Sequence, residues 1–102
     1  MIEDKEYKIG QMSFTFEREV VDNVETLTLI TEKVIDTGVV EIQIHLYPED
    51  NTFHYTVNYF DKEGNYYLQN DEIGKVLTET EINECHKKLL EISSEQPWKD
   101  PL

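Results

Sequence analysis

The chain has 102 residues, of which 22 are Asp or Glu and 9 are Lys or Arg, so its formal net charge at pH 7 is −13. An acidic surface of this kind repels nucleic acid and anionic membranes and attracts basic proteins. The length fits one domain, and the sequence contains no apolar run long enough for a transmembrane helix. We therefore expect a single acidic domain over residues 1–102 that binds neither nucleic acid nor a membrane.

The acidic residues are spread along the whole chain and are interleaved with aromatic residues, which make up 11% of the sequence. A disordered acidic tail would instead show a block of like charge with few aromatics. The first six residues are too acidic for a signal peptide, and the single cysteine, Cys85, leaves no partner for an internal disulfide. The chain has no Ala and one Arg, a bias typical of AT-rich genomes. We expect a cytoplasmic protein of a bacterial host or a phage-infected cell.

Apolar and polar residues alternate from position 12 to 21, which predicts a half-buried strand. Asp22–Asn23 follows, and both residues tolerate the left-handed backbone of a two-residue hairpin turn. The chain then returns through 24–35 as a second strand. In this register Phe16 lies opposite Leu29, and the hairpin has one apolar face and one face of Glu and Thr.

Residues 39–47 and 52–60 predict a second hairpin around the turn residues 48–51. This register places Ile44 opposite Tyr55, so that apolar side chains meet apolar side chains on one face. We expect it to place His45 opposite His54 on the other face.

Two joins in the sheet need separate attention. A three-residue loop over Asp36–Gly38 would turn Leu27 and Leu29 to the wrong face, so we expect a longer loop or a bulge there. Beyond a turn at 61–64, a short strand over 65–69 would bring Tyr66 and Leu68 beside Tyr59 and Val57. Together these segments predict an antiparallel meander of about five strands over residues 12–69.

Residues 78–93 predict the one helix. Thr78 and Glu81 stand at the spacing of a capping box, and a stripe of apolar residues recurs at helical spacing through Ile82, Cys85, Leu89 and Ile92. A sheet with one apolar face needs a cover, so we predict an α+β fold with this C-terminal helix packed on that face. The tail over 94–102, which carries Trp98, is expected to fold over the edge of the core.

No motif predicts catalysis, a cofactor or a metal. His45 and His54 give two imidazoles where a zinc site requires three or four ligands. Cys85 and His86 are adjacent on the helix and point in different directions, so we interpret Cys85 as a core residue. The paired carboxylates lie in turns and on polar faces, where they stay solvated. The sequence therefore predicts a protein without enzymatic activity, with no metal and no cofactor.

The charge favours an inhibitor that binds a basic protein, plausibly a nuclease or another nucleic-acid enzyme. Outward residues on a strand repeat about every 6.8 Å, which is comparable to the spacing of phosphates. Glu17 and Glu19, with Asp22 and Glu25 at the turn, would then imitate a short phosphate row. In charge and size alone, the chain resembles small acidic phage and immunity proteins, which include DNA mimics, anti-restriction and anti-CRISPR proteins and immunity proteins of nuclease toxins.

Strand parity also places Phe60 and Tyr67 together on the polar side of the meander. We predict that they form an aromatic patch of interface composition, unless the tail or residues 7–9 cover it. Two alternative functions remain open at this point. One is a small acidic bacterial housekeeping or adaptor domain with an unknown partner. The other is a small-ligand protein with a pocket between helix and sheet, lined by Tyr55, Tyr59 and Tyr66.

Overall fold

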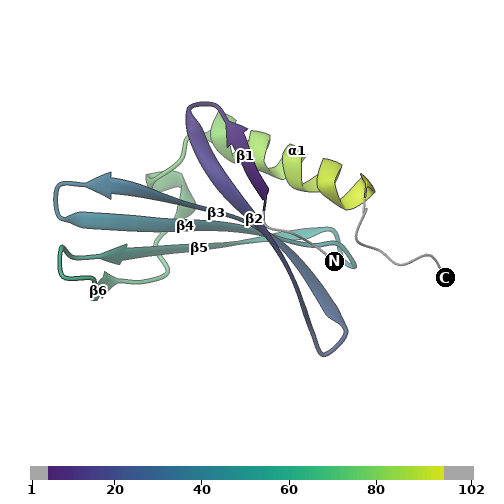
Figure 1. The fold of residues 1–102 in the computed structure, drawn as a ribbon, viewed down its shortest axis with the longest axis horizontal. Coiled ribbons are helices and arrows are strands. Elements are labelled where there is room, and N and C mark those ends of the chain that lie inside the picture. Colours follow the sequence, from purple (N-terminus) through teal and green to yellow (C-terminus); the bar gives the residue numbers. More distant parts are fainter. Residues whose placement is uncertain (1–4, 96–102) are drawn as a thin grey trace.

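A computed structural model describes residues 5–95, which form one antiparallel sheet with a helix packed against it (Figure 1). The strands follow one another as a meander in the order β1 to β6. This confirms the predicted α+β architecture, with six strands where about five were expected. The elements are β1 (Lys5–Ile9), β2 (Met12–Val21), β3 (Val24–Ile35), β4 (Gly38–Tyr47), β5 (Thr52–Phe60), β6 (Tyr66–Leu68), the short 3₁₀ helix η1 (Ile73–Lys75) and α1 (Glu79–Glu95).

The additional strand is β1, which pairs with the first half of β2 at one edge of the sheet. Gly10, with φ of +64°, lies in the tight turn that brings Ile9 opposite Met12. Ile9 is buried in the core, and Tyr7 packs edge-on against Phe16 with ring centroids 6.3 Å apart. Residues 7–9 are thus built into the β2 edge of the sheet and do not cover Phe60 on β5.

The β2–β3 hairpin has the predicted register, with Val21 opposite Val24 and Phe16 opposite Leu29. Asp22 and Asn23 have φ values of +53° and +65°, as a two-residue turn of the mirror-image type requires.

The β3–β4 connection is shorter than we expected. Ile35 pairs with Gly38, so the loop consists of two residues, and the prediction of a longer loop or a bulge was wrong. The shorter loop places Leu27 opposite Leu46 and keeps it in the core. Gly38 follows this turn next to β5, where a Cβ would lie 1.9 Å from the carbonyl oxygen of Phe60, so the position accepts only glycine without a shift of the backbone.

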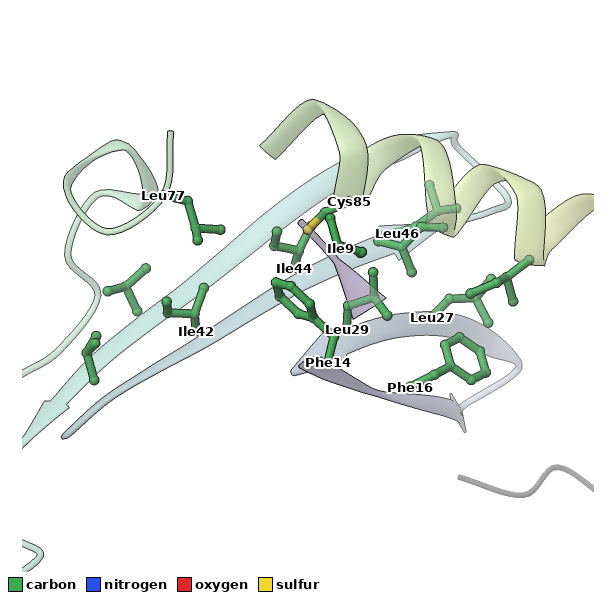
Figure 2. Close-up of a cluster of buried hydrophobic side chains, with 14 residues drawn as sticks. Ile9, Phe14, Phe16, Leu27, Leu29, Ile42, Ile44, Leu46, Leu77 and Cys85 are labelled. Carbon is green, nitrogen blue, oxygen red and sulfur yellow. The ribbon is translucent and has the colours of Figure 1, made fainter. Parts of the chain in front are cut away.

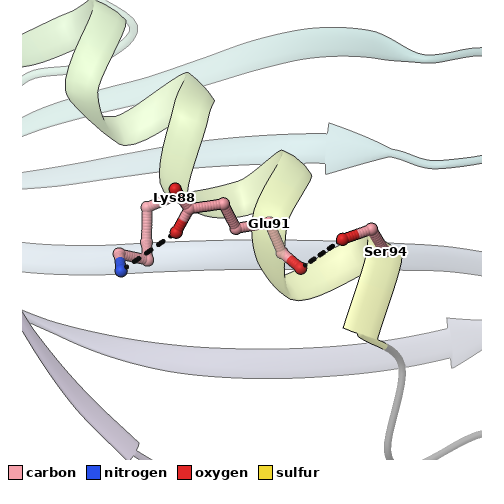
Figure 3. A network of polar contacts seen from close by, with 3 residues as sticks. All are labelled: Lys88, Glu91 and Ser94. Carbon is pink, nitrogen blue, oxygen red and sulfur yellow. Dashed lines mark hydrogen bonds and ion pairs between the residues drawn. The ribbon is translucent and has the colours of Figure 1, made fainter.

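The helix begins as the capping box predicts. The amide of Glu81 donates to Thr78 Oγ1 at 3.1 Å, and the amide of Thr78 donates to Glu81 Oε1 at 2.8 Å. The helix ends at Glu95, beyond the expected residue 93. In its last turns Lys88 pairs with Glu91 at 3.3 Å, and Ser94 Oγ donates to the carbonyl of Glu91 at 2.9 Å (Figure 3). The predicted tail with Trp98 lies almost wholly outside the described residues.

The core lies between α1 and one face of the sheet, which we call the covered face (Figure 2). Phe14, Leu29, Ile44 and Val57 supply it from successive strands, and the predicted stripe of α1 packs onto them. The loop that carries η1 lies on the same side, where Lys33 Nζ donates to the carbonyl of Val76 at 2.8 Å. The opposite face, which we call the open face, has no helix over it within residues 5–95 (Figure 1).

None of the helices in residues 5–95 has the length and apolar character needed to cross a membrane.

Candidate functional site

The open face carries most of the acidic side chains of the sheet. Strand residues alternate between the two faces, and the cross-strand partners assign the acids Glu6, Glu17, Glu19, Glu32 and Glu41 to the open face. Among the described strand residues, Lys8 is the one base on this side, opposite Ser13. The open face is therefore strongly acidic.

The predicted acidic row is only partly assembled. Glu17 and Glu19 are exposed and share the open face, and Asp22 is exposed in the turn beyond them. Glu25 instead lies on the covered-face side of the hairpin, because its neighbours by parity are the core leucines of β3. There it accepts a hydrogen bond from Arg18 Nε at 2.6 Å. A row of all four carboxylates does not form.

The acids of α1 cannot extend this row either. The helix packs on the covered face (Figure 1), so the sheet separates Glu79, Glu84 and Glu95 from Glu17 and Glu19. Negative charge is therefore presented on two sides of the molecule rather than on one continuous surface.

A row of polar side chains crosses the open face beside Glu17, through Thr28, His45 and His54. The Nδ1 of His45 lies 2.9 Å from Thr28 Oγ1, and its Nε2 lies 2.9 Å from Thr56 Oγ1. Burial, with a smaller effect from His54, lowers the pKa of His45, and Glu19 acts in the opposite direction.

The predicted pairing of His45 with His54 is confirmed. Both ring nitrogens of His45 are engaged by hydroxyl groups, and the ring of His54 packs edge-on against Tyr47 at 4.9 Å. Within residues 5–95, no three His, Cys, Asp or Glu side chains are grouped in a way that would hold a metal ion. The two imidazoles therefore make cross-strand contacts that hold neighbouring side chains of the open face in place.

The expected aromatic patch has a different composition. An irregularity between Tyr59 and Phe60 shifts the register of β6, so that Tyr66 pairs with Phe60 and Leu68 with Tyr59. The rings of Phe60 and Tyr66 pack 4.4 Å apart. The placement of Phe60 beside Tyr67 was wrong, as was the pairing predicted for β6, because strand parity alone cannot reveal a bulge.

Tyr67 belongs to a separate group of contacts. Its ring lies 5.8 Å from that of Tyr59, a residue that packs against the core, and its hydroxyl lies 2.7 Å from Thr37 Oγ1. Tyr67 therefore links β6 to the β3–β4 turn through this hydrogen bond and does not belong to the Phe60–Tyr66 pair.

Phe60 is one member of an apolar row that crosses four strands on the open face. Val34 pairs with Val39, Val39 with Phe60, and Phe60 with Tyr66. We call these four residues the apolar ladder. Val34 is 87% exposed and Tyr66 is 53% exposed. The apolar ladder thus offers apolar surface to solvent beside the acidic residues.

A shallow hollow adjoins the apolar ladder, between the β3–β4 and β5–β6 turns. Its volume is about 480 Å³, and Val34, Val39 and Phe60 form its apolar wall. Glu32, Asp61 and Lys62 contribute polar groups at its border. Gly38 also lines the hollow, and a Cβ on it would collide with the backbone of Phe60 and Asp61.

The three tyrosines predicted to line a ligand pocket do not meet. Tyr66 lies against Phe60 on the open face, whereas the hydroxyl of Tyr55 is hydrogen-bonded to His86 Nε2 at 2.7 Å. Burial raises the pKa of Tyr59, and a hydrogen bond with Asp71 acts in the same direction. The three tyrosines therefore take part in separate packing contacts and hydrogen bonds, and they do not line a common pocket.

Cys85 is fully buried in the core, as its place on the helical stripe predicts. Burial raises the pKa of its thiol to about 12, with smaller contributions from Glu81 and Glu84. A protonated and inaccessible thiol is not a nucleophile. His86 stacks on Phe53 with ring centroids 3.9 Å apart, and burial lowers its pKa.

Similarity to known proteins gives no further guidance to the site. No family model, curated protein or solved structure matches this chain. The candidate site is therefore defined by geometry alone: the acids of the open face, the apolar ladder and the hollow beside it.

The sequence pattern predicted Glu17, Glu19 and Phe60 as contact residues, but it did not reveal Val34 and Tyr66 as members of the same row. The signal for Val34 was available, because an exposed valine on the Glu and Thr face breaks the alternation of the strand. Its neighbours could not be assigned without the length of the turn at Asp36–Thr37.

Proposed function

We propose that this protein has no enzymatic activity and binds a basic protein through the open face of its sheet. We further propose that it acts as an inhibitor of a nucleic-acid enzyme, such as a nuclease, in the cytoplasm of a bacterial host or a phage-infected cell. The observation that supports this most directly is the excess of acidic side chains on the open face. Among the described strand residues, this face carries five carboxylates and one lysine.

Among the described residues, the carboxylates of the open face also form no ion pairs. Within residues 5–95, the ion pairs join Glu25 to Arg18, Asp71 to Lys75 and Glu91 to Lys88, all away from this face. Glu17 and Glu19 are exposed and take part in no ion pair there. Their full charge is available to a partner, and such a field increases the rate of encounter with a basic surface.

Nucleic-acid enzymes are the favoured class of partner because they carry basic surfaces that neutralise phosphates. The two outward carboxylates of β2 lie at a spacing comparable to that of phosphates. Since Glu25 and the α1 acids lie elsewhere, the proposed contact does not require a duplex-like array. It combines the local charge of the open face with the apolar surface next to it.

The test is affinity capture by the full chain from a lysate of its host, followed by purification of the captured protein. Raising the salt concentration from 0.1 M to 1 M shortens the Debye length from about 10 Å to about 3 Å. We expect a basic nucleic-acid enzyme to be retained at low salt and released at high salt, and the purified enzyme to lose activity when the chain is added. Recovery of no basic protein at either salt would contradict the proposal.

A matched pair of variants locates the contact. Glu17→Gln combined with Glu19→Gln removes two charges from the open face, and Glu84→Gln combined with Glu95→Gln removes two exposed charges from α1. We expect only the first pair to weaken capture markedly.

A captured partner whose activity is unchanged by binding would instead indicate an adaptor.

A further inference from the structure

We propose that the apolar ladder and the adjoining hollow are the docking site for a large apolar side chain, carried on a lysine- or arginine-rich segment of the basic partner. This inference rests on the proposed function and names the contact surface. The geometry that carries it is an exposed apolar row lying directly beside two neighbouring, unneutralised carboxylates.

The two ends of the apolar ladder are exposed, and its middle residues, Val39 and Phe60, are half-buried. Val34 is 87% exposed on the open face, so its side chain contributes little to the core. The ladder crosses β3, β4, β5 and β6, which at about 4.8 Å per strand spacing makes a row about 14 Å wide. Phe60 and Tyr66, packed 4.4 Å apart, form its aromatic end. Aromatic residues of this kind are enriched at the centres of protein contacts.

The hollow next to the apolar ladder can receive a side chain of the partner. Its volume of about 480 Å³ lies against Val34, Val39 and Phe60. Contacts of high affinity are centred on anchor side chains that fill such recesses and lose their water. Gly38 lines the recess where its backbone lies against the Phe60 carbonyl, at a distance that leaves no room for a Cβ.

The acids beside the apolar ladder specify the charge of the occupant. Glu32 and Glu41 are direct cross-strand partners on the open face. Like charges in opposite positions of a sheet destabilise it, and within residues 5–95 neither carboxylate has an ion pair. Gln43 Nε2 donates a hydrogen bond to Glu41 Oε1 at 3.2 Å, which leaves the charge of the pair in place. A cation of the partner placed between them would relieve the repulsion.

The same carboxylates argue against a second copy of this chain as the occupant. Two copies that paired their apolar ladders about a two-fold axis would bring Glu32 and Glu41 of one copy close to those of the other. Each copy also carries a net charge of −13. Repulsion therefore opposes self-association and favours a partner of opposite charge.

The first experiment uses three synthetic peptides of equal length with the full-length chain. One has a Trp-Leu pair flanked by four lysines, the second has the same lysines around Gly-Ser, and the third has Trp-Leu flanked by four glutamates. We expect the first to bind at least ten-fold more tightly than the second, and the third not to bind. The amide resonances of the apolar ladder should shift on binding. Equal affinity of the two lysine peptides would overturn the proposal.

Variants provide the matched control. Val34→Ser should weaken the Trp-Leu lysine peptide at least five-fold, whereas Val21→Ser, at another exposed valine of the sheet, should leave its affinity unchanged. Glu32→Gln with Glu41→Gln should weaken the peptide and raise the melting temperature, because the like-charge pair is removed. Equal effects of the two serine variants would exclude the apolar ladder as the contact.

Other results separate the two proposals. If sedimentation shows a dimer that Val34→Ser dissociates, the occupant is a second copy and this inference is wrong. If neither lysine peptide binds, the docking site is wrong, and the proposed function then depends on the lysate capture alone. If the capture succeeds and Val34→Ser does not weaken it, the function stands and only this surface is excluded.

Discussion

Replacing Gly38 by alanine tests the close approach of two turns that shapes the hollow. The added Cβ would lie 1.9 Å from the carbonyl oxygen of Phe60 and 2.8 Å from the carbonyl carbon of Asp61, and both neighbours are backbone. Forced overpacking costs about 1–3 kcal/mol. The φ of +148° adds strain of about 1–3 kcal/mol for a residue with a Cβ. Together they predict a loss of about 2–6 kcal/mol of unfolding free energy.

Urea unfolding and thermal melting of the full chain measure this loss. With a shift of about 4–8 °C per kcal/mol for a domain of this size, the melting temperature should fall by about 8 °C or more. Gly64→Ala separates the two causes, because its φ is +87° but nothing lies within 4 Å. It should cost about 1–2 kcal/mol. Gly74→Ala has neither feature and should change stability by less than about 1 kcal/mol. A Gly38 variant no less stable than the Gly64 variant would refute the reasoning.

Three further predictions concern the helix and the titrating groups. Thr78→Ala should cost about 1 kcal/mol of stability in urea unfolding, because it removes the N-cap, and Thr80→Ala, inside the helix, should cost less. Burial lowers the pKa of His45 below its usual 6.5, so the unfolded chain binds more protons. The stability from His45 is therefore present above pH 6.5 and lost as the pH falls through the folded-state pKa, and an NMR titration should give a midpoint below 6.5. Cys85, whose pKa is raised to about 12, should react with a thiol reagent at pH 8 only at the rate of unfolding.

Local signals in the sequence determined the hairpins and the helix start correctly. The alternation in β2, β4 and β5 fixed which side chains are buried, and the register followed wherever the turn residues were decisive, as at Asp22–Asn23. The capping box at Thr78 and Glu81 could likewise be recognised from the sequence, because both partners lie within one turn of helix. These features depend on neighbours close in sequence.

The errors arose where a contact between distant segments decided the structure. At the β3–β4 turn, Gly38 lies against the backbone of Phe60, 22 positions away, and no local pattern reports that contact. The bulge at Phe60 in turn exchanged Tyr67 for Tyr66 in the aromatic cluster.

The acidic row failed for a local reason. Glu25 follows a tight turn, and strand parity past that turn places it with Arg18 on the covered-face side. A row of charges counted along the chain therefore overstated the charge on one face. The surface that sequence reasoning missed, the apolar ladder, is built from four strands and exists only in the assembled sheet.

Hydrogen exchange of the full chain, alone and bound to its purified basic partner, tests the central claim most directly. The account predicts slower exchange in β3, β4 and β5 around Val34, Val39 and Phe60, with no change on the outer surface of α1. Protection confined to α1 and absent from these strands would contradict the account.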